Sequence, residues 1–240
     1  MIERQGDVTT PDGEMTTFIH HPEYGGPFPV VLYLMDAPSI RPALQDMASR
    51  LASAGYYVML PYLYYRGGPY REFGASDEDM HARRELMETV TPTGILTDGA
   101  ALLDFAATDD AARAGHVGAV GFCMSGGLTI ALAKALPDRV TAAASIHGAW
   151  LVRDTDDSPH RGLEAMRAEL YFAWCADDPT APVADMELME DALKAAGIEY
   201  RIDFLTDAVH GFAPAGERYH RASSELHWER VHALLRRNVG

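Results

Sequence analysis

The residues best suited to chemistry lie in one glycine-rich segment, Gly121-Phe-Cys-Met-Ser-Gly-Gly127. The β-branched run over 117–122 predicts a buried strand, and the Ala- and Leu-rich stretch over 128–136 predicts a helix. A turn of this kind between a strand and a helix can raise a nucleophile on a strained backbone. Cys123 stands at the nucleophile position, where the helix N-terminus favours a thiolate.

Such a turn requires small residues two places either side of the nucleophile, because a Cβ there would collide with the neighbouring strand or helix. Gly121 and Ser125 meet this requirement around Cys123. Two other interpretations stay open at this point. In a shifted register Ser125 is the nucleophile and Gly127 is the far small residue. Alternatively, the segment is a glycine-rich βα turn that carries an inert buried cysteine.

Acid and base groups follow three other predicted strands, over 29–35, 170–175 and 200–205. The residues are Asp36 with Ala37, Asp177 with Asp178, and His210. In an open parallel sheet the carboxyl ends of the strands lie at one edge, where ligands bind. Nucleophilic acyl transfer needs a thiol or hydroxyl, an imidazole that takes and returns its proton, and a carboxylate that orients the imidazole. The local pattern does not separate Asp177 from Asp178 as the acid.

The order of the predicted elements indicates an α/β fold. Apolar runs suited to buried strands alternate with amphipathic helices, as over 29–35, 42–54 and 56–60, and this alternation requires right-handed parallel crossovers. Residues 1–20 predict a hairpin around a Pro-Asp-Gly turn. We therefore expect a mostly parallel central sheet with helices on both faces, in a single α/β domain over 1–240.

Charge and composition exclude several classes of partner. The 240 residues carry a formal charge of -15, so phosphate backbones and anionic membrane surfaces would repel the chain. The N-terminus lacks the apolar core of a signal peptide, and no run of about 18 apolar residues occurs. We therefore expect a cytoplasmic protein with no nucleic-acid or membrane partner. The two cysteines, Cys123 and Cys175, form neither a disulfide framework nor a CxxC motif, and no metal site is expected.

The motifs together closely resemble the dienelactone hydrolase family of α/β hydrolases. The resemblance rests on Gly121-Phe-Cys-Met-Ser-Gly-Gly, Asp178-Pro-Thr-Ala-Pro182, His210-Gly-Phe and Leu60-Pro-Tyr-Leu-Tyr64, and it spans nearly the whole chain. It implies the α/β-hydrolase fold and a Cys-Asp-His triad in the order nucleophile, acid, histidine. Matched motif to motif, these roles fall on Cys123, Asp178 and His210. The family's oxyanion donors fall on the backbone N–H groups of Ala37 and Met124.

The chain departs from the dienelactone-cleaving members of that family at two positions. Asp36 stands where they carry a Glu that contacts the resting thiol, and Pro214 stands where they carry an Arg that helps hold the substrate carboxylate. A second carboxylate-binding Arg of the family corresponds to Arg83 or Arg84, which the sequence does not separate. Loss of a bidentate Arg removes a strong orienting contact. The resemblance therefore implies a related substrate rather than dienelactone itself.

The resulting expectation is a hydrolase that cleaves a small ester, lactone or thioester through an acyl-enzyme on Cys123. It needs no cofactor and acts as a monomer or homodimer. The expected substrate-pocket residues are Asp36, Tyr64, His147 and Trp150. For Asp36 three roles stay open, because this side chain could tether the thiol, line the pocket or cap the next helix.

Two other functions fit the same frame. In the first, the protein is a thiol-based redox sensor or a non-catalytic binding protein, with Cys175 as the resolving thiol for Cys123. In the second, it is a peptidase on the same fold. Neither function accounts for Asp178 and His210 as economically as the hydrolase interpretation does.

Overall fold

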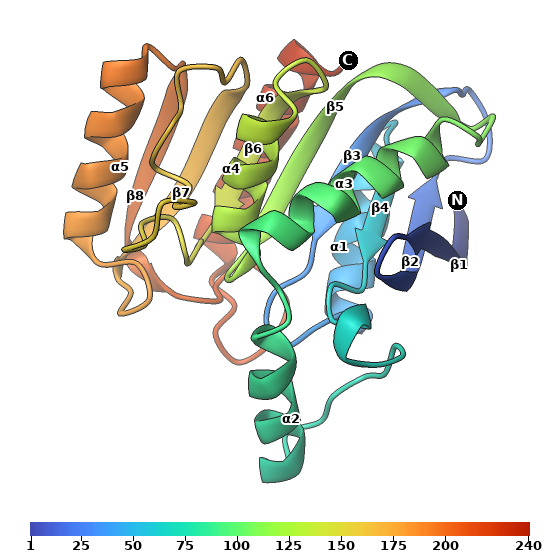
Figure 1. Ribbon diagram of the computed structural model, residues 1–240, viewed down its shortest axis with the longest axis horizontal. Helices are drawn as coiled ribbons and strands as arrows, with labels where there is room; N and C mark the ends of the chain where they lie inside the picture. The colour runs from blue at the N-terminus through green and yellow to red at the C-terminus, as the bar shows by residue number, and fades with distance from the viewer. The chain divides into compact units, whose positions relative to one another are not determined.

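The computed structural model describes residues 1–113 and 115–240, together with the backbone of Ala114. The chain folds into two compact units, Met1–Ala114 and Gly115–Gly240. Strand β5 (Ala112–Phe122) begins in the first unit and ends in the second. Figure 1 follows the chain by colour from the N-terminus to the C-terminus.

The first unit contains a mixed sheet. Strands β1 (Ile2–Thr10) and β2 (Gly13–His21) form the predicted hairpin, and β2 also pairs antiparallel with β4 (Tyr57–Pro61). Strand β3 (Phe28–Leu34) pairs parallel with β4, and helix α1 (Pro42–Ser53) connects the two. The predicted parallel crossover is therefore confirmed, and every residue of β3 and β4 is buried, as expected of strands covered on both faces.

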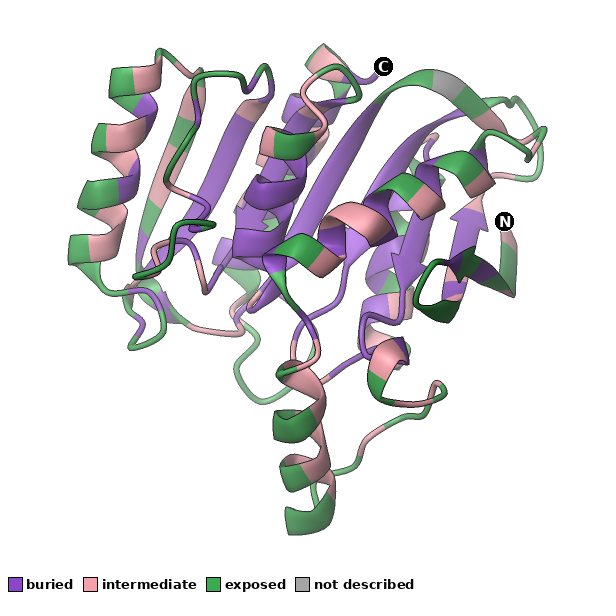
Figure 2. Ribbon diagram, in the orientation of Figure 1, coloured by how far each residue is buried: buried purple, intermediate pink, exposed green. Residues whose placement is uncertain are grey.

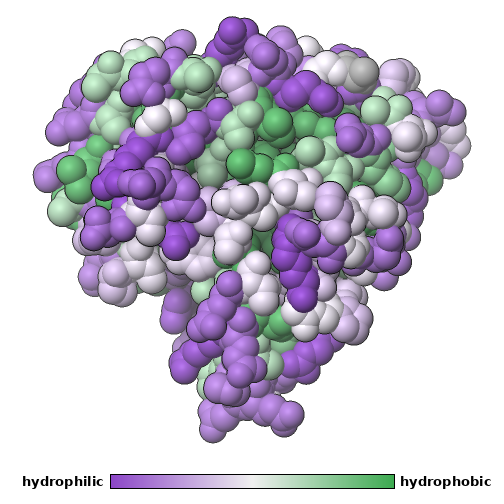
Figure 3. Space-filling view, viewed as in Figure 1, coloured by the Kyte–Doolittle hydropathy of each residue, from purple (hydrophilic) through white to green (hydrophobic). Residues whose placement is uncertain are grey.

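Helices cover both faces of this mixed sheet. Helix α1 packs on β2 and β4, whereas α3 (Pro92–Ala106) packs on β1 and β3, and in Figure 1 the two lie behind and in front of the sheet. A short 3-10 helix η1 (Tyr65–Gly67) and helix α2 (Asp77–Met87) come between β4 and α3. All residues of α2 are described and none is buried, and in Figure 3 its surface is mainly hydrophilic.

The second unit is built on a fully parallel sheet. From β5 the strand order continues through β6 (Val140–Ile146), β7 (Glu169–Asp177) and β8 (Tyr200–Val209), and each neighbouring pair is parallel. All carboxyl ends of these strands therefore lie at one edge. The β5 strand begins at Ala112, earlier than the sequence predicts.

Three helices complete the second unit: α4 (Ser125–Ala135), α5 (Val183–Ala196) and α6 (Arg221–Asn238). Helices α4 and α6 both pack on β6, and Figure 1 shows them on opposite faces of the sheet. The first nine residues of α4 are all buried, as the continuous colour in Figure 2 shows. A helix that is buried on every side lies within the core rather than on its surface. Among the described helices, none combines a bilayer-spanning length with a sufficiently apolar composition.

Candidate active site

Cys123 occupies the turn between β5 and α4, and its backbone φ of +52° lies in the left-handed region. For a residue with a Cβ this conformation costs about 1 to 3 kcal/mol and persists only where the surroundings impose it. Here the Cys123 N–H donates to the Ile146 carbonyl oxygen at 3.2 Å. The Cys123 carbonyl oxygen accepts from the N–H groups of Gly126 at 2.9 Å and Ala149 at 2.7 Å. The structure thus contains the strained turn that the sequence predicts.

Close packing explains the small residues around Cys123. A Cβ built on Gly121 would collide with the Thr129 side chain and with the Ser125 carbonyl group. A Cβ on Gly126 would collide with the backbone of Gly148. Backbones that approach this closely exclude any larger residue, which is the physical reason for the predicted glycine pattern.

The two possible nucleophiles of this turn differ in access. Cys123 is a free cysteine and is only partly buried. Ser125 is the first residue of α4 and has 0% exposed surface. A substrate can reach the Cys123 position but cannot reach the Ser125 hydroxyl without movement of the helix, and this difference favours Cys123 over the shifted register.

Asp178 and His210 lie side by side after the ends of β7 and β8. The His210 Nδ1 atom is 2.6 Å from Asp178 Oδ2. Asp178 is 4% exposed, whereas the adjacent Asp177 ends β7 and is exposed. Of the two carboxylates that the sequence leaves open, Asp178 is therefore the one that binds the imidazole.

Thr180 is a partner of this pair that the sequence reasoning missed. Its backbone N–H donates to Asp178 Oδ1 at 2.9 Å, and its hydroxyl lies 2.7 Å from the same oxygen and 3.1 Å from His210 Nδ1. An Asp side chain that binds the backbone two residues later forms an Asx turn. The Asp-Pro-Thr sequence was the available signal for it. The turn holds one carboxylate oxygen so that the other faces His210.

These contacts shift the pKa values of both groups. Burial lowers the pKa of His210, but hydrogen bonds to Asp178 and Cys123 and the charges of both outweigh burial and raise the pKa to about 10. Burial raises the pKa of Asp178, but hydrogen bonds from His210 and Thr180 outweigh it, and the net pKa lies below its usual value. Both shifts favour an imidazolium beside a carboxylate.

The Cys123 side chain lies close enough to the His210 ring to raise its pKa, through a hydrogen bond and through its charge. Because Nδ1 is taken by Asp178, Nε2 is the nitrogen left for the sulfur. Three residues that are far apart in the sequence thus form one hydrogen-bonded series within the second unit. A series of thiol, imidazole and carboxylate can generate a thiolate and return a proton to a leaving group.

Met124 follows Cys123 directly and is the N-cap residue of α4, with 1% exposed surface. Its backbone N–H therefore belongs to the amino end of the helix, where the helix dipole favours negative charge. The position is compatible with the predicted oxyanion donor.

Asp36 belongs to the first unit, where Arg41 binds both of its oxygens. Arg41 Nη1 donates to Oδ1 at 2.6 Å, and Nη2 donates to Oδ2 at 2.8 Å. The N-cap residue of α1 is Arg41 and not Asp36, so the helix-cap role considered for Asp36 does not apply. The sequence does not predict this bidentate pair, because a spacing of five residues between Asp36 and Arg41 does not by itself indicate that the two side chains meet.

Ala37 and Tyr64 also lie in the first unit and contact each other. The Tyr64 hydroxyl donates to the Ala37 carbonyl oxygen at 2.9 Å, and the Tyr64 side chain is fully buried. Tyr64 was expected to line the substrate pocket. Its observed contact instead fixes the peptide group that follows the predicted oxyanion donor.

A pocket of about 230 Å³ in the first unit is lined by Ala37 and by residues of α2, including Arg83 and Arg84. Among the described residues, the buried Nε of Arg83 has no hydrogen-bond partner, and Arg84 is exposed. Of the two arginines that the sequence leaves open, Arg83 therefore has the unsatisfied donor that a bound anion would complete.

His147 and Trp150 follow β6 in the second unit. His147 is 1% exposed, and its ring contacts His210 and two phenylalanines rather than open space. Trp150 is partly exposed, and its ring lies near the guanidinium of Arg153. Only Trp150 of this pair presents surface that a substrate could contact.

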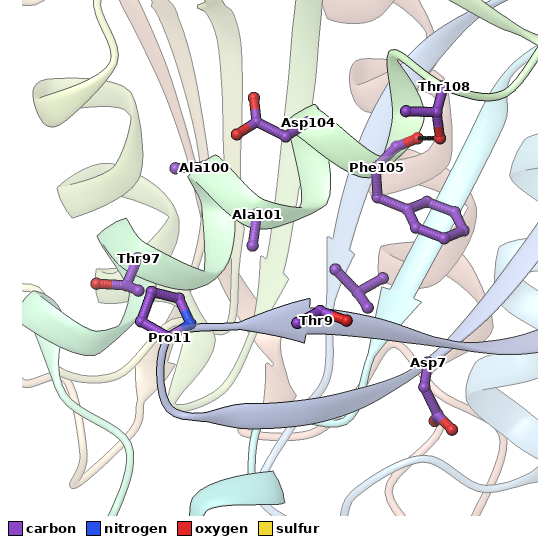
Figure 4. A pocket seen from close by; sticks show the side chains of 10 residues that line it. Asp7, Thr9, Pro11, Thr97, Ala100, Ala101, Asp104, Phe105 and Thr108 are labelled. Atoms are coloured by element: carbon purple, nitrogen blue, oxygen red, sulfur yellow. Dashed lines mark hydrogen bonds between the residues drawn. The ribbon is translucent and has the colours of Figure 1, made fainter.

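A larger hollow, of about 740 Å³, lies between β1 and α3 in the first unit (Figure 4). Val8, Ala101 and Phe105 form part of its apolar lining, and Asp7 and Asp104 stand at its margins. None of the described residues that line it is a cysteine or a histidine. The thiol and the imidazole of the second unit therefore have no counterpart in this lining.

Metal-binding groups are not gathered anywhere in the described residues. Within residues 1–113 and 115–240, no three His, Cys, Asp or Glu side chains are placed to hold a metal ion.

A mostly parallel sheet with helices and a strained strand-to-helix turn defines an α/β hydrolase. Residues 15–239 match the model of the dienelactone hydrolase family. The chain belongs to the dienelactone hydrolase family, and it is a hydrolase.

Individual relatives agree with this assignment. A Synechocystis sp. protein provisionally named a carboxymethylenebutenolidase is 28% identical over 234 residues, covering 95% of this chain and 94% of the relative. The carboxymethylenebutenolidase of Rhodococcus opacus is 25% identical over 227 residues, covering 92% and 86%. A crystal structure of a Klebsiella pneumoniae protein provisionally described as a dienelactone hydrolase shares the fold, with a TM-score of 0.86, 24% identity and 97% of each chain covered.

Proposed function

We propose that this hydrolase cleaves a small ester, lactone or thioester by covalent catalysis at Cys123. The observation that carries the proposal is the hydrogen-bonded series from Cys123 through His210 to Asp178. The left-handed backbone and the partial exposure of Cys123 support it, because they present the sulfur to a substrate.

The proposed reaction has two stages. His210 takes the Cys123 proton, and the resulting thiolate attacks the acyl carbon of the substrate. When the tetrahedral intermediate collapses, the carbon–oxygen or carbon–sulfur bond to the leaving group breaks and His210 returns the proton to that group. A water molecule then gives a proton to His210 and attacks the thioester, which releases the acid and restores the thiol. Asp178 holds the imidazole tautomer throughout.

Charge on the substrate oxygen is proposed to be stabilised by the Met124 backbone N–H, at the amino end of α4. The sequence assigns the second donor to the Ala37 N–H, and that assignment stays a prediction. Removal of one such donor typically costs on the order of 100-fold or more in rate.

For the substrate class we favour a lactone or ester that carries an acidic group. The names of the Synechocystis and Rhodococcus relatives refer to a butenolide, which is an unsaturated lactone. The same names specify a carboxymethylene substituent, which carries a negative charge near neutral pH. Pro214 offers no positive charge, and the exposed Arg218 has its Nη1 3.4 Å from the His210 carbonyl oxygen. This arrangement favours a substrate other than dienelactone.

The geometry disfavours the redox-sensor alternative. Cys175 is 1% exposed, and burial and the charge of Asp178 raise its pKa to about 12. Strand β6 lies between β5 and β7, so the strands that carry Cys123 and Cys175 are about 9 to 10 Å apart. A disulfide requires Cα atoms within about 7 Å. A Cys123–Cys175 bond would therefore require the sheet to open. For the peptidase alternative, no contact among the described residues favours a peptide substrate over a small ester.

The test compares Cys123→Ala with Ser125→Ala and Cys175→Ala, using p-nitrophenyl acetate and mass spectrometry of the intact protein. We expect Cys123→Ala to lose about 1000-fold or more in kcat and to form no acyl adduct. The two control variants should keep turnover within a few fold of the parent, and their adduct should map to Cys123. Parental turnover in Cys123→Ala, or an adduct on Ser125, would contradict the proposal.

A further inference from the structure

Backbone strain is concentrated in one short segment beside the nucleophile. We define the 147–150 loop as His147, Gly148, Ala149 and Trp150, which follow β6. The φ of His147 is +38° and that of Trp150 is +61°. Together with Cys123, these are three of the four non-glycine residues of the described chain that have a positive φ. Strain of this kind gathers at functional sites, where the surroundings enforce it.

The 147–150 loop holds the nucleophile turn through Ala149. The Ala149 N–H donates to the Cys123 carbonyl oxygen at 2.7 Å, and the Ala149 carbonyl oxygen accepts from the Gly127 N–H at 3.0 Å. These two bonds tie the loop to the residues before and after the start of α4. Any shift of the 147–150 loop therefore moves the backbone that carries Cys123.

The same loop contacts the base through His147. The centroids of the His147 and His210 rings are 5.1 Å apart, with an angle of 64° between the planes. Phe122 and Phe212 enclose the other sides of the His147 ring, at centroid distances of 5.8 and 5.3 Å. The ring is thus locked in place by aromatic neighbours, and it forms a rigid surface against His210.

His147 does not behave as an acid or a base in this setting. Burial first, and then the nearby His210 and His227, lower its pKa well below the usual value, against the opposing charge of Asp178. Among the described residues, neither ring nitrogen has a hydrogen-bond partner on another residue, and only a contact with the backbone of His147 itself acts on its pKa in the same direction as Asp178. A buried polar group without a partner destabilises the folded chain. Hydrogen bonding and titration therefore do not account for a histidine at this position.

We propose that His147 is a positioning residue for His210, with its ring as the surface that keeps the imidazole in line between Cys123 and Asp178. This inference rests on the proposed function, because it assigns His210 as the base. Through Ala149 and His147, one four-residue loop would then set the position of both the nucleophile and the base.

The left-handed backbone is compatible with a histidine at this position. Asn, Asp and His are several-fold enriched among residues with a positive φ, whereas Phe is not. Asn would satisfy the backbone but lacks a ring. Phe would supply a ring but suits the backbone less well. Histidine combines both properties, and its unpartnered nitrogens are the accompanying cost.

The two properties are separated by the variants His147→Phe, which keeps the ring, and His147→Asn, which keeps the backbone preference. If the ring positions His210, His147→Phe should retain kcat within about threefold. His147→Asn should lose about 10- to 100-fold in kcat with little change in KM, as expected for a misplaced catalytic group. The rate of Cys123 alkylation by iodoacetamide near pH 7 should fall in parallel for His147→Asn and remain parental for His147→Phe. Should His147→Asn fail to fold by circular dichroism, His147→Gln replaces it, with the same expectation.

The alkylation rate separates failure of this inference from failure of the proposed function. If Cys123→Ala is inactive but His147→Asn matches the parent in kcat and alkylation, the positioning role is wrong and the Cys123 mechanism stands. If His147→Phe loses as much as His147→Asn, the ring surface is not what matters, and the inference is again overturned. If Cys123→Ala keeps parental turnover, the proposed function itself is wrong.

Discussion

At the scale of single residues, the site is an imidazole held from both ends. Asp178 and Thr180 contact Nδ1 of His210, which leaves Nε2 for Cys123. Because Thr180 binds the Asp178 oxygen that does not face His210, the carboxylate cannot rotate away from the ring. Contacts on two sides therefore stabilise the protonated form of His210, the imidazolium.

This arrangement predicts a pH dependence of stability. The pKa of His210 in the folded chain is about 10, above its usual value of 6.5. The folded state therefore binds this proton more tightly than the unfolded state does. The stabilisation is complete below about pH 6.5 and is lost as the pH rises towards about 10. Urea unfolding of the parent and of His210→Gln at several pH values should show a difference in free energy that shrinks across this window.

Cys123→Ala is the informative companion to this measurement. The hydrogen bond and charge of Cys123 contribute to the raised pKa of His210. The free energy of unfolding should therefore fall less with rising pH in Cys123→Ala than in the parent. If the parent, His210→Gln and Cys123→Ala show parallel curves, the imidazolium is not held by these contacts.

Sequence alone identified the triad candidates but not their supporting contacts. Cys123 and His210 follow predicted strands, so their positions could be inferred from the pattern, whereas the choice of Asp178 over Asp177 came from the resemblance to the dienelactone hydrolase family. Thr180 was missed because its role depends on the rotamer of Asp178. The sequence predicts His147 in the pocket wall, and the structure shows the ring buried beside His210; spacing alone does not encode this burial, because it depends on the packing of several elements.

At the scale of elements, the nucleophile turn depends on the close approach of β5 and α4. Gly121 in β5 faces the Thr129 side chain and the Ser125 carbonyl group with no space for a Cβ. The strand, the turn and the first turns of the helix therefore form one packed assembly, and a change in any of them is transmitted to Cys123.

Gly121→Ala is expected to destabilise the protein by about 1 to 3 kcal/mol, the typical cost of overpacking, and to lower kcat by displacing Cys123. Gly6→Ala in β1 is the matched control, because a Cβ there meets nothing within 4 Å and no positive φ applies. Its stability should equal or exceed that of the parent. Unfolding midpoints and kcat of both variants decide the matter, and equal effects of the two substitutions would show that Gly121 is not under steric constraint.

The elements themselves were largely predictable, and their ends were not. The hairpin, the β3–α1–β4 crossover and the parallel strands of the second unit follow from hydrophobic periodicity and turn residues. Strand β8 extends to Val209, past the predicted end at 205, and α4 begins at Ser125 rather than 128. These boundaries are set by pairing with β7 and by burial against neighbouring strands, which local patterns do not encode.

At the scale of the whole molecule, the sequence predicts one domain over 1–240, while the fold has two compact units. A domain in the thermodynamic sense is defined by cooperative unfolding rather than by compactness alone. Strand β5 belongs to both units, so unfolding of either one would disrupt a strand of the other. This continuity is the physical reason to expect a single transition.

The distribution of tryptophan makes that expectation measurable. All three tryptophans, Trp150, Trp174 and Trp228, lie in the second unit, and the last two are buried. Their fluorescence therefore reports on the second unit, whereas far-ultraviolet circular dichroism reports on both. If the chain is one domain, urea midpoints from the two signals coincide, and amide protection in β4 and β6 is lost at the same urea concentration. Separate midpoints, with β4 and β6 exchanging at different concentrations, would mean that the two units unfold independently and that the single-domain prediction is wrong.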